Sequence, residues 1–394
     1  MSLRLGLILC SVLSGGLALP WVVQGADPPP ISFQTVVGER FRIWDQNLDG
    51  LLTSEETSKL VLNPGIKGRE AAAVAAIHVS FRRAGAPAGL SIFDLLQPSD
   101  KPAERRDVDD HKVHFAADYA RFDRHVRELP RQIFTIAAAP ALDGMAQGKL
   151  GDCYLVAVVG AAVHRDPKSV RDMFRIQLDG SNELLFPNGE RLKVPALTDG
   201  EIMLGSSAEN QGLWLNVLEK AYGQLRLRQQ GAGPGPGELE LDIIARGGDA
   251  QHTLSLLTGR DAQWIPFQPR TPRNSPPPSY TRRLALREQF RTQLIGALRR
   301  RQLVCVSTPK IRLPPGIIPG HDYALLDFDP LTNVAHLWNP WGVTYSFTPQ
   351  GDHPGLEHGY EVRRGHFEMP FDDFIKVFNG IWCEAVEPPL PGGK

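Results

Sequence analysis

The fold of this chain is decided by residues 147–163, which read QGKLGDCYLVAVVGAAV. Gly148 and Gly151 predict a turn, and the uncharged run after them predicts a buried helix that begins near Cys153. A thiol at the N-terminus of a helix lies at the positive end of the helix dipole, which favours the reactive thiolate. A lone cysteine is more often a buried structural residue, so a catalytic interpretation requires a partner elsewhere in the chain.

Such a partner is predicted in residues 319–342, PGHDYALLDFDPLTNVAHLWNPWG. The apolar runs 323–328 and 334–338 predict two strands joined by a turn. His321 precedes the first strand and Asn339 follows the second. Because paired strands lie about 4.8 Å apart, these two ends face one another in an antiparallel hairpin, and Asn339 can hold the imidazole of His321. A cysteine, then a distant histidine, then an asparagine is the order typical of thiol proteases.

Six segments resemble, in the right order, the calpain family of papain-like cysteine proteases. They are QGKLGDCYLVA (147–157), LWLNVLEKAY (213–222), GGDAQHTLSLLTG (247–259), GHDYALL (320–326), NPWG (339–342) and RRGHFEMPFDDFIKVF (363–378). The family usually has tryptophan where this chain has Tyr154. The resemblance covers roughly residues 140–386, and it implies an α+β fold with a papain-like core made of a helical lobe and a β-rich lobe.

The roles of the family's residues carry over by position. The resemblance implies that Cys153 is the nucleophile, His321 the general base and Asn339 the residue that orients the imidazole. Gln147 matches the side-chain donor to the oxyanion, and Trp341 matches the tryptophan that shields the histidine and asparagine from water. The implied function is a calpain-type cysteine endopeptidase, with a protein or peptide as substrate.

The chain departs from the family at the positions that bind calcium in the protease core. Acidic ligands of the family fall here at Gly144, Gly212, Tyr345, Arg364 and His366. None of these residues supplies the carboxylate oxygens that a hard cation requires. We therefore expect a core whose lobes align without calcium.

A different calcium site is predicted near the N-terminus, in residues 45–56, DQNLDGLLTSEE. The spacing is that of an EF-hand loop, with glycine at position six and a closing glutamate at position twelve. The predicted Ca²⁺ ligands are Asp45, Asn47, Asp49, the carbonyl of Leu51, and Glu56. The alternative is a surface turn that happens to carry acids. EF-hands normally pair, and the predicted helix 68–83 with the segment after it is a candidate partner that lacks the early ligands.

Residues 1–26 have the pattern of a secretory signal: Arg4, an uncharged stretch, and small residues at Gly25 and Ala26. This predicts export to the periplasm or beyond the cell, and an uncleaved membrane anchor is the alternative. No other segment approaches a membrane-spanning length. The chain has 43 Lys and Arg against 44 Asp and Glu, a balance that argues against nucleic acid as a partner.

The predicted organisation has five parts. They are a signal peptide (1–26), an EF-hand region (27–66), a helical linker region (67–138), the protease core (139–388) with lobes at about 139–228 and 240–388, and a tail (389–394). The second function that the sequence allows is a catalytically silent, calcium-binding scaffold or interaction protein with a calpain-like core. The oligomeric state, the cleavage preference and a possible inhibitory role of residues 27–138 do not follow from the sequence.

Overall fold

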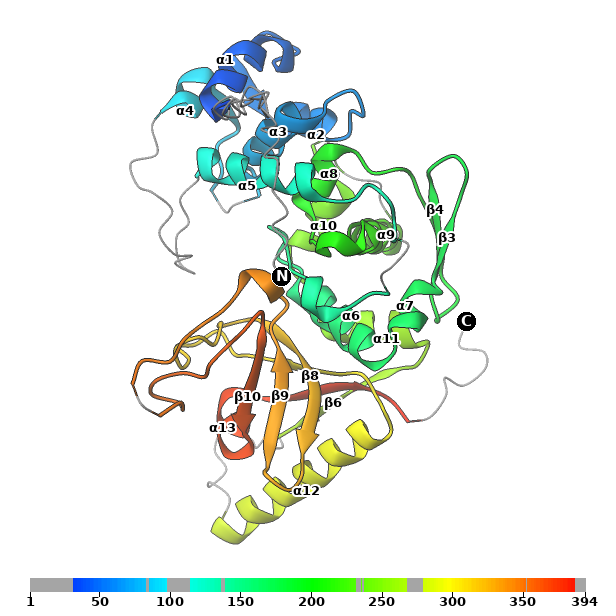
Figure 1. The fold of residues 1–394 in the computed structure, drawn as a ribbon, viewed down its shortest axis with the longest axis vertical. Coiled ribbons are helices and arrows are strands. Elements are labelled where there is room, and N and C mark those ends of the chain that lie inside the picture. Colours follow the sequence, from blue (N-terminus) through cyan, green and yellow to red (C-terminus); the bar gives the residue numbers. More distant parts are fainter. Residues whose placement is uncertain are drawn as a thin grey trace, which may run out of the picture. The chain divides into compact units, whose positions relative to one another are not determined.

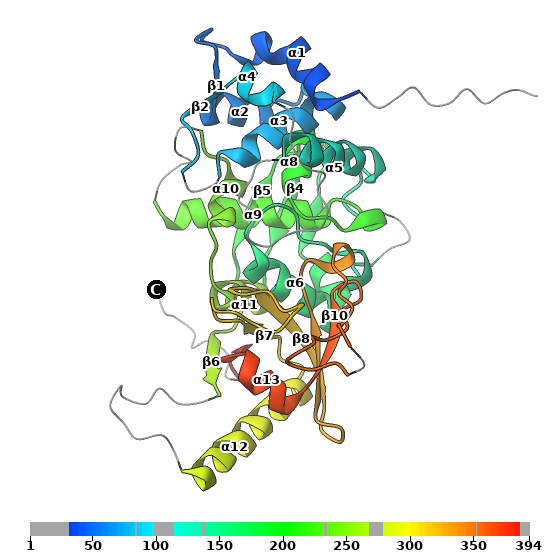
Figure 2. The same cartoon turned by 90° about the vertical axis from the view of Figure 1, so that its left-hand side faces the viewer.

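The computed structural model describes residues 31–82, 85–97, 114–135, 139–231, 235, 237–267, 279–351 and 353–386. Figures 1 and 2 show their path in two views at right angles. The predicted signal peptide and tail lie outside these residues. Among the described residues, no helix combines the length and the apolar character needed to cross a membrane.

A six-stranded antiparallel sheet forms the β-rich lobe, in the order β10-β9-β8-β7-β11-β6. The strands are β6 (Ala262–Pro266), β7 (Val304–Ser307), β8 (Asp322–Asp329), β9 (Val334–Trp338), β10 (His366–Pro370) and β11 (Gly380–Glu384). Figure 1 shows β8, β9 and β10 side by side. The hairpin of β8 and β9 is the one that the apolar runs 323–328 and 334–338 predict. His321, just before β8, and Asn339, just after β9, lie at its open end.

Two helices belong to this lobe, α12 (Tyr280–Arg299) and α13 (Phe371–Val377). Phe290 and Leu294 of α12 and Phe374 of α13 are buried in one apolar cluster with the sheet. The sequence does not predict α12, because only three of its twenty residues are buried and its charges are spread around the helix.

The helical lobe contains α6 (Cys153–Arg165), α7 (Pro167–Arg171), α8 (Asp199–Leu204), α9 (Trp214–Gln229), α10 (Glu240–Ala245) and α11 (Ala250–Thr258). Helix α6 is apolar nearly all round and packs directly against β8 of the other lobe. Gly160 permits this approach, because a Cβ there would lie 2.5 Å from the Trp338 ring. The core therefore places the first residue of α6 next to the open end of the hairpin.

This lobe also contains three strands that the sequence analysis does not anticipate. They are β3 (Phe174–Ile176), β4 (Asn182–Leu185) and β5 (Arg191–Val194), and they form a separate antiparallel sheet. Strands of three or four residues are too short to show a clear alternation of apolar and polar side chains, which explains why the pattern does not reveal them.

The N-terminal region consists of α1 (Phe33–Trp44), β1 (Leu51–Thr53), α2 (Ser54–Val61), α3 (Gly68–Ser80), β2 (Gly89–Ser91), α4 (Ile92–Leu96) and α5 (Phe115–Glu128). Strands β1 and β2 pair antiparallel, and Figure 2 shows them side by side. Helices α1 and α2 lie on either side of the predicted calcium loop, and the predicted helix 68–83 begins where α3 begins.

Specific contacts attach this region to the protease core. The hydroxyls of Ser54 and Ser58 on α2 both donate to the carbonyl of Gly237, at 3.0 and 2.7 Å. Arg82 forms an ion pair with Asp242 of α10, at 2.6 Å between Nε and Oδ1. Gly237 lies in the segment 231–238, which the sequence predicts as the boundary between the lobes. The exit helix of the candidate calcium loop therefore contacts that boundary directly.

Candidate active site

Cys153 is the first residue of α6, as the pattern of residues 147–163 predicts. Its Sγ lies 4.0 Å from Oδ2 of Asp322, the residue that follows His321. Burial, together with the nearby Asp322 carboxylate, raises the pKa of the Cys153 thiol to about 12. In this arrangement the thiol is protonated at neutral pH, although the start of the helix favours the thiolate.

His321 and Asn339 meet across the open end of the hairpin. Nε2 of His321 lies 2.9 Å from Oδ1 of Asn339, and both residues are buried. The same Oδ1 accepts a hydrogen bond from the backbone N–H of Trp341 at 3.0 Å, which fixes the orientation of the amide. Because an amide oxygen only accepts, Nε2 must carry the imidazole proton, and Nδ1 is left to exchange a proton with a nucleophile.

Two aromatic rings enclose the imidazole. The centroids of Trp341 and Tyr323 lie 5.2 and 5.0 Å from that of His321. Burial lowers the pKa of His321 to about 4, although the hydrogen bond to Asn339 opposes this shift. The imidazole is therefore neutral at pH 7, as a general base must be.

Within the described ranges, no hydrogen bond joins the thiol of Cys153 and the imidazole of His321. Among the described residues, the hydrogen bond of the Cys153 side chain goes to Asp322, and that of the imidazole goes to Asn339. Cys153 must turn away from Asp322 before its proton can pass to His321. The sequence patterns assign no role to Asp322. The one signal in the sequence that could have identified Asp322 is that it directly follows His321, the candidate base.

Asp322 should suppress thiolate formation at neutral pH. Burial raises the pKa of Asp322 to about 6, so above that pH its carboxylate is charged and opposes a second negative charge on Cys153. We expect Asp322→Asn to accelerate alkylation of Cys153 by iodoacetamide about tenfold at pH 7.5, since one unit of thiol pKa is worth a factor of ten.

At pH 5 the parent carboxyl is largely protonated, so the two chains should then react at similar rates. Labelling of the buried Cys305 and Cys383 in the same samples is the internal control. An unchanged rate at pH 7.5 would show that Asp322 does not govern the thiol.

Gln147 lies beside the nucleophile, but its amide hydrogens are engaged. Nε2 donates to the carbonyl of Leu150 at 2.6 Å and to Oδ1 of Asp152 at 3.0 Å. Both neighbours are acceptors, which fixes the orientation of the side-chain amide. Its Oε1 is buried without a partner among the described residues. For Gln147 to donate to an oxyanion, at least one of these hydrogen bonds must be exchanged.

A buried pair of acids supports this turn, and sequence reasoning missed it. Asp152 and Glu219 are both fully buried, and the negative charge of Asp152 acts on the carboxyl group of Glu219. Burial raises the pKa of Asp152 to about 6 and that of Glu219 well above its usual range. Glu219 also accepts from the backbone N–H of Ser206 at 2.8 Å. The pair is stable only if it shares a proton, because two buried carboxylates in contact repel each other. The sequence signal that could have revealed this pair is Glu219, an acidic residue within the largely apolar segment 213–222.

Direct contacts between the lobes occur where the family would place calcium ligands. Arg364 donates to the carbonyl of Asp143 at 2.6 Å and lies 3.6 Å from Glu209. His366 lies 3.6 Å from the carboxylate of Asp143. Gly144 is closely packed, since a Cβ there would lie 2.1 Å from the Gln211 side chain. Gly212 and Tyr345, likewise, provide no carboxylate.

Residues 45–56, predicted as a calcium loop, turn at Gly50. Gly50 has a φ of +83°, and its N–H donates to Oδ2 of Asp45 at 2.9 Å. Oδ1 of Asp45 is buried and has no partner among the described residues. Glu56 is buried and points into the loop, where Oε1 accepts from the N–H of Gln46 at 3.0 Å. The buried, unpartnered oxygen of Asp45 is thus the feature of this segment that is compatible with a cation ligand.

The remaining side chains of this loop are turned to each other. Asn47 donates to Asp49 at 2.9 Å, and both are exposed. Within the described ranges, no three His, Cys, Asp or Glu side chains converge as they would around a metal ion. Asn47 and Asp49 must therefore rotate inward to complete a shell of oxygen ligands.

The pairing of β1 with β2 joins this loop to a second helix–loop–helix segment. Leu52 pairs with Leu90, and both are buried. Thr53 and Ser91 each cap the next helix, with an acid three residues later completing the capping box. The short β1–β2 ladder therefore holds residues 51–53 against residues 89–91.

The family of this chain follows from its similarity to known proteins. The sequence profile described as Calpain family cysteine protease matches residues 124–383. Calpain-9 of Rattus norvegicus is 26% identical over 284 residues, an alignment that covers 63% of this chain and 37% of that relative. The chain thus aligns with less than half the length of this relative. The matched region includes Cys153, His321 and Asn339, and this chain belongs to the calpain family of cysteine proteases.

Proposed function

We propose that this protein is an exported cysteine endopeptidase that hydrolyses peptide bonds through Cys153, His321 and Asn339. The observation that carries the proposal is the buried hydrogen bond between His321 and Asn339 beside the start of α6. This hydrogen bond places the imidazole proton on Nε2 and leaves Nδ1 free to act as a general base. Helix α6 begins at Cys153, the proposed nucleophile. Export rests on the pattern of residues 1–26.

The reaction follows from the roles of these groups. Cys153 turns from Asp322, Nδ1 of His321 takes the thiol proton, and the thiolate attacks the carbonyl carbon of the peptide. The tetrahedral oxyanion is stabilised by the Cys153 backbone N–H and by Gln147, once Gln147 exchanges one of its present acceptors. The carbon–nitrogen bond breaks as His321 returns the proton to the leaving amine, which leaves a thioester. Water, deprotonated by His321, then releases the acid and restores the thiol.

Thiol labelling and hydrolysis together test this function. The full chain should cleave unfolded casein, and iodoacetamide should abolish the cleavage while modifying Cys153 before Cys305 and Cys383. The physical reason is access, since Cys153 is half-buried whereas the other two are fully buried. Cleavage is measured by gel and peptide mass spectrometry, and labelled cysteines by peptide mapping.

A second function, a catalytically silent scaffold, is favoured by the contact of the thiol with Asp322 rather than His321. Equal and slow labelling of the three cysteines, with no hydrolysis, would support the scaffold and contradict the endopeptidase.

We propose further that the lobes align without calcium in the protease core. The contacts of Arg364 and His366 with Asp143 and Glu209 connect the two lobes directly. Cleavage should therefore not require an ion at these positions.

Calcium binding is proposed at residues 45–56, with the side chains of Asp45, Asn47, Asp49 and Glu56 and the carbonyl of Leu51 as ligands. The buried, unpartnered oxygen of Asp45 and the inward carboxylate of Glu56 support this assignment. Through Ser54 and Ser58, the exit helix α2 holds Gly237, so calcium would brace the boundary between the lobes.

Glu56→Gln should weaken calcium binding to the full chain at least tenfold, because the variant loses a charged oxygen that closes the loop. Isothermal titration with CaCl₂ measures the affinity. Glu55→Gln is the matched control, since Glu55 is exposed and pairs with Lys59 instead of the loop. Equal affinity in Glu56→Gln and the parent would refute the ligand assignment.

A further inference from the structure

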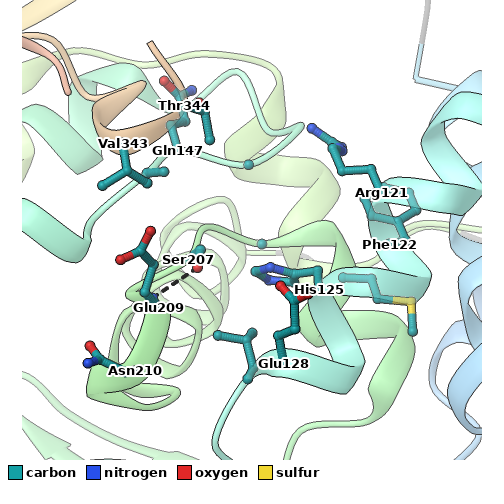
Figure 3. A pocket seen from close by; sticks show the side chains of 15 residues that line it. Arg121, Phe122, His125, Glu128, Gln147, Ser207, Glu209, Asn210, Val343 and Thr344 are labelled. Atoms are coloured by element: carbon teal, nitrogen blue, oxygen red, sulfur yellow. Dashed lines mark hydrogen bonds between the residues drawn. The ribbon is translucent and has the colours of Figure 1, made fainter. Parts of the chain in front are cut away.

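A cavity of about 370 Å³ adjoins the candidate active site, within the size range of ligand pockets, about 300–1,000 Å³. Figure 3 shows its labelled side chains, which come from four separate parts of the chain. Its lining includes Arg121, His125 and Glu128 of α5, Gln147 and Gly148 before the nucleophile, Glu209 and Asn210, and Val343 and Thr344.

The position of the cavity follows from its walls. Gln147 and Gly148 belong to the turn that leads to Cys153, so one wall of the cavity is the turn before the nucleophile, although Cys153 itself is not among the lining residues. Val343 lies two residues beyond Trp341, whose ring packs against the imidazole of His321. Because the imidazole returns its proton to the leaving amine, the substrate residues after the scissile bond must lie on the His321 side. The cavity is therefore on the leaving-group side.

The inner wall of the cavity is apolar. Phe122, Leu129 and Met203 are buried, and Val343 is half-buried. This surface suits the aliphatic part of a long side chain.

Glu128 provides a negative charge at the rim. It is the last residue of α5, where the negative end of the helix dipole disfavours a carboxylate. Within the part of the chain that the structure describes, the Glu128 side chain has no ion pair or hydrogen bond, and the residue is exposed. A charge placed against the local helix preference, and without a partner, is typical of a functional position.

The other charged groups of the cavity are engaged or neutral. Arg121 lies 3.9 Å from Asp118 and over the ring of Phe122. Glu209 lies 3.6 Å from Arg364. His125 carries no charge at neutral pH, because burial lowers its pKa to about 4, and its buried Nε2 has no partner among the described residues. Within the described ranges, a basic group entering the cavity thus meets the unpaired Glu128 carboxylate, a neutral imidazole, and the charges of Arg121 and Glu209, which Asp118 and Arg364 offset.

We propose that this cavity is a substrate subsite on the leaving-group side that selects a lysine or arginine side chain through Glu128. The inference rests on the proposed endopeptidase function. The stem of the basic side chain packs on Phe122, Leu129 and Met203, and its charged end pairs with Glu128. Helix α5 of the N-terminal region thereby takes part in substrate selection, and the protease core does not form the subsite alone.

The first test is direct binding, which needs no turnover. A full-length Cys153→Ala chain is titrated with three fluorescent peptides. They differ only at the two residues after the scissile bond, and both of these residues are lysine in the first peptide, norleucine in the second and glutamate in the third. Norleucine keeps the stem of lysine and removes the charge. We expect the lysine peptide to bind about fivefold to tenfold tighter than the norleucine peptide, the effect of one partly exposed ion pair.

Variants at Glu128 identify the residue responsible. Glu128→Gln in the Cys153→Ala chain should abolish the preference for lysine, and Glu128→Lys should shift it to glutamate. Both changes are compatible with folding, because removing a negative charge from a helix C-terminus is favourable. Glu39→Gln, an equal change of charge at an exposed residue of α1 that does not line the cavity, should leave the preference unchanged.

The second test is cleavage. In the chain with Cys153 intact, kcat/KM for quenched peptides of the same series should follow the same order. Equal affinities for lysine and norleucine peptides, or a preference that persists in Glu128→Gln, would overturn the subsite. Binding that depends on Glu128, without any cleavage, would uphold the subsite and refute the endopeptidase.

Discussion

Replacing His321 with alanine is expected to lower kcat/KM for peptide hydrolysis at least about 10³-fold. The burial and the Asp322 carboxylate that raise the thiol pKa leave Cys153 protonated, so without the imidazole no group removes its proton. The leaving amine also loses its acid. Because His321 acts in the transition state, kcat should fall and KM should change little.

His336→Ala is the matched control for this prediction. His336 lies on β9, its side chain is 39% exposed, and its partner is Glu368, 3.3 Å away. Its removal should change kcat/KM less than twofold. Quenched-peptide assays measure both variants, with thermal unfolding to verify the fold. A His321→Ala chain that keeps a tenth of the parent activity would refute His321 as the base.

Replacing Lys220 with methionine is expected to destabilise the protein by about 3–5 kcal/mol. Lys220 of α9 forms a buried ion pair with Glu201 of α8, and their side chains are only 6% and 2% exposed. Glu201 also caps α8 by accepting from the N–H of Thr198 at 2.9 Å. The variant leaves Glu201 buried without its cation. The loss is large against a typical total stability of about 5–15 kcal/mol.

Two further variants separate the buried charge from the change of shape. Lys220→Met with Glu201→Gln should recover most of the loss, because no uncompensated charge is left. Lys59→Met removes the cation of an exposed pair with Glu55, whose side chains are 56% and 53% exposed, and should cost less than about 1 kcal/mol. Urea unfolding measures all three. If Lys220→Met lowered the free energy of unfolding by less than about 1 kcal/mol, the buried Glu201 carboxylate would not require the Lys220 cation.

The residues proposed for catalysis were accessible from the sequence because their placement depends on local rules. A turn followed by an apolar run places Cys153 at a helix start, and two alternating runs around a turn place His321 and Asn339 at one end of a hairpin. The same holds for the turn at Gly50, whose N–H donates to Asp45 five residues earlier.

Other features of the site depend on contacts between distant segments. The carboxyl pair of Asp152 and Glu219 joins residues 67 positions apart in the chain. The contact of Cys153 with Asp322 depends on how α6 packs against β8. The cavity requires α5, the turn at Gln147 and the segment at Val343 to meet.

The amino-acid sequence by itself thus determined the helix that begins at Cys153, the hairpin that brings His321 to Asn339 and the turn at Gly50, because helix, hairpin and turn patterns are short-range. The tertiary structure alone decided which acceptors hold Gln147, which carboxylate faces the thiol and which helix completes the pocket. Those features depend on burial and on contacts between segments far apart in the chain. Local periodicity and residue spacing in the sequence predict neither the burial nor the contacts.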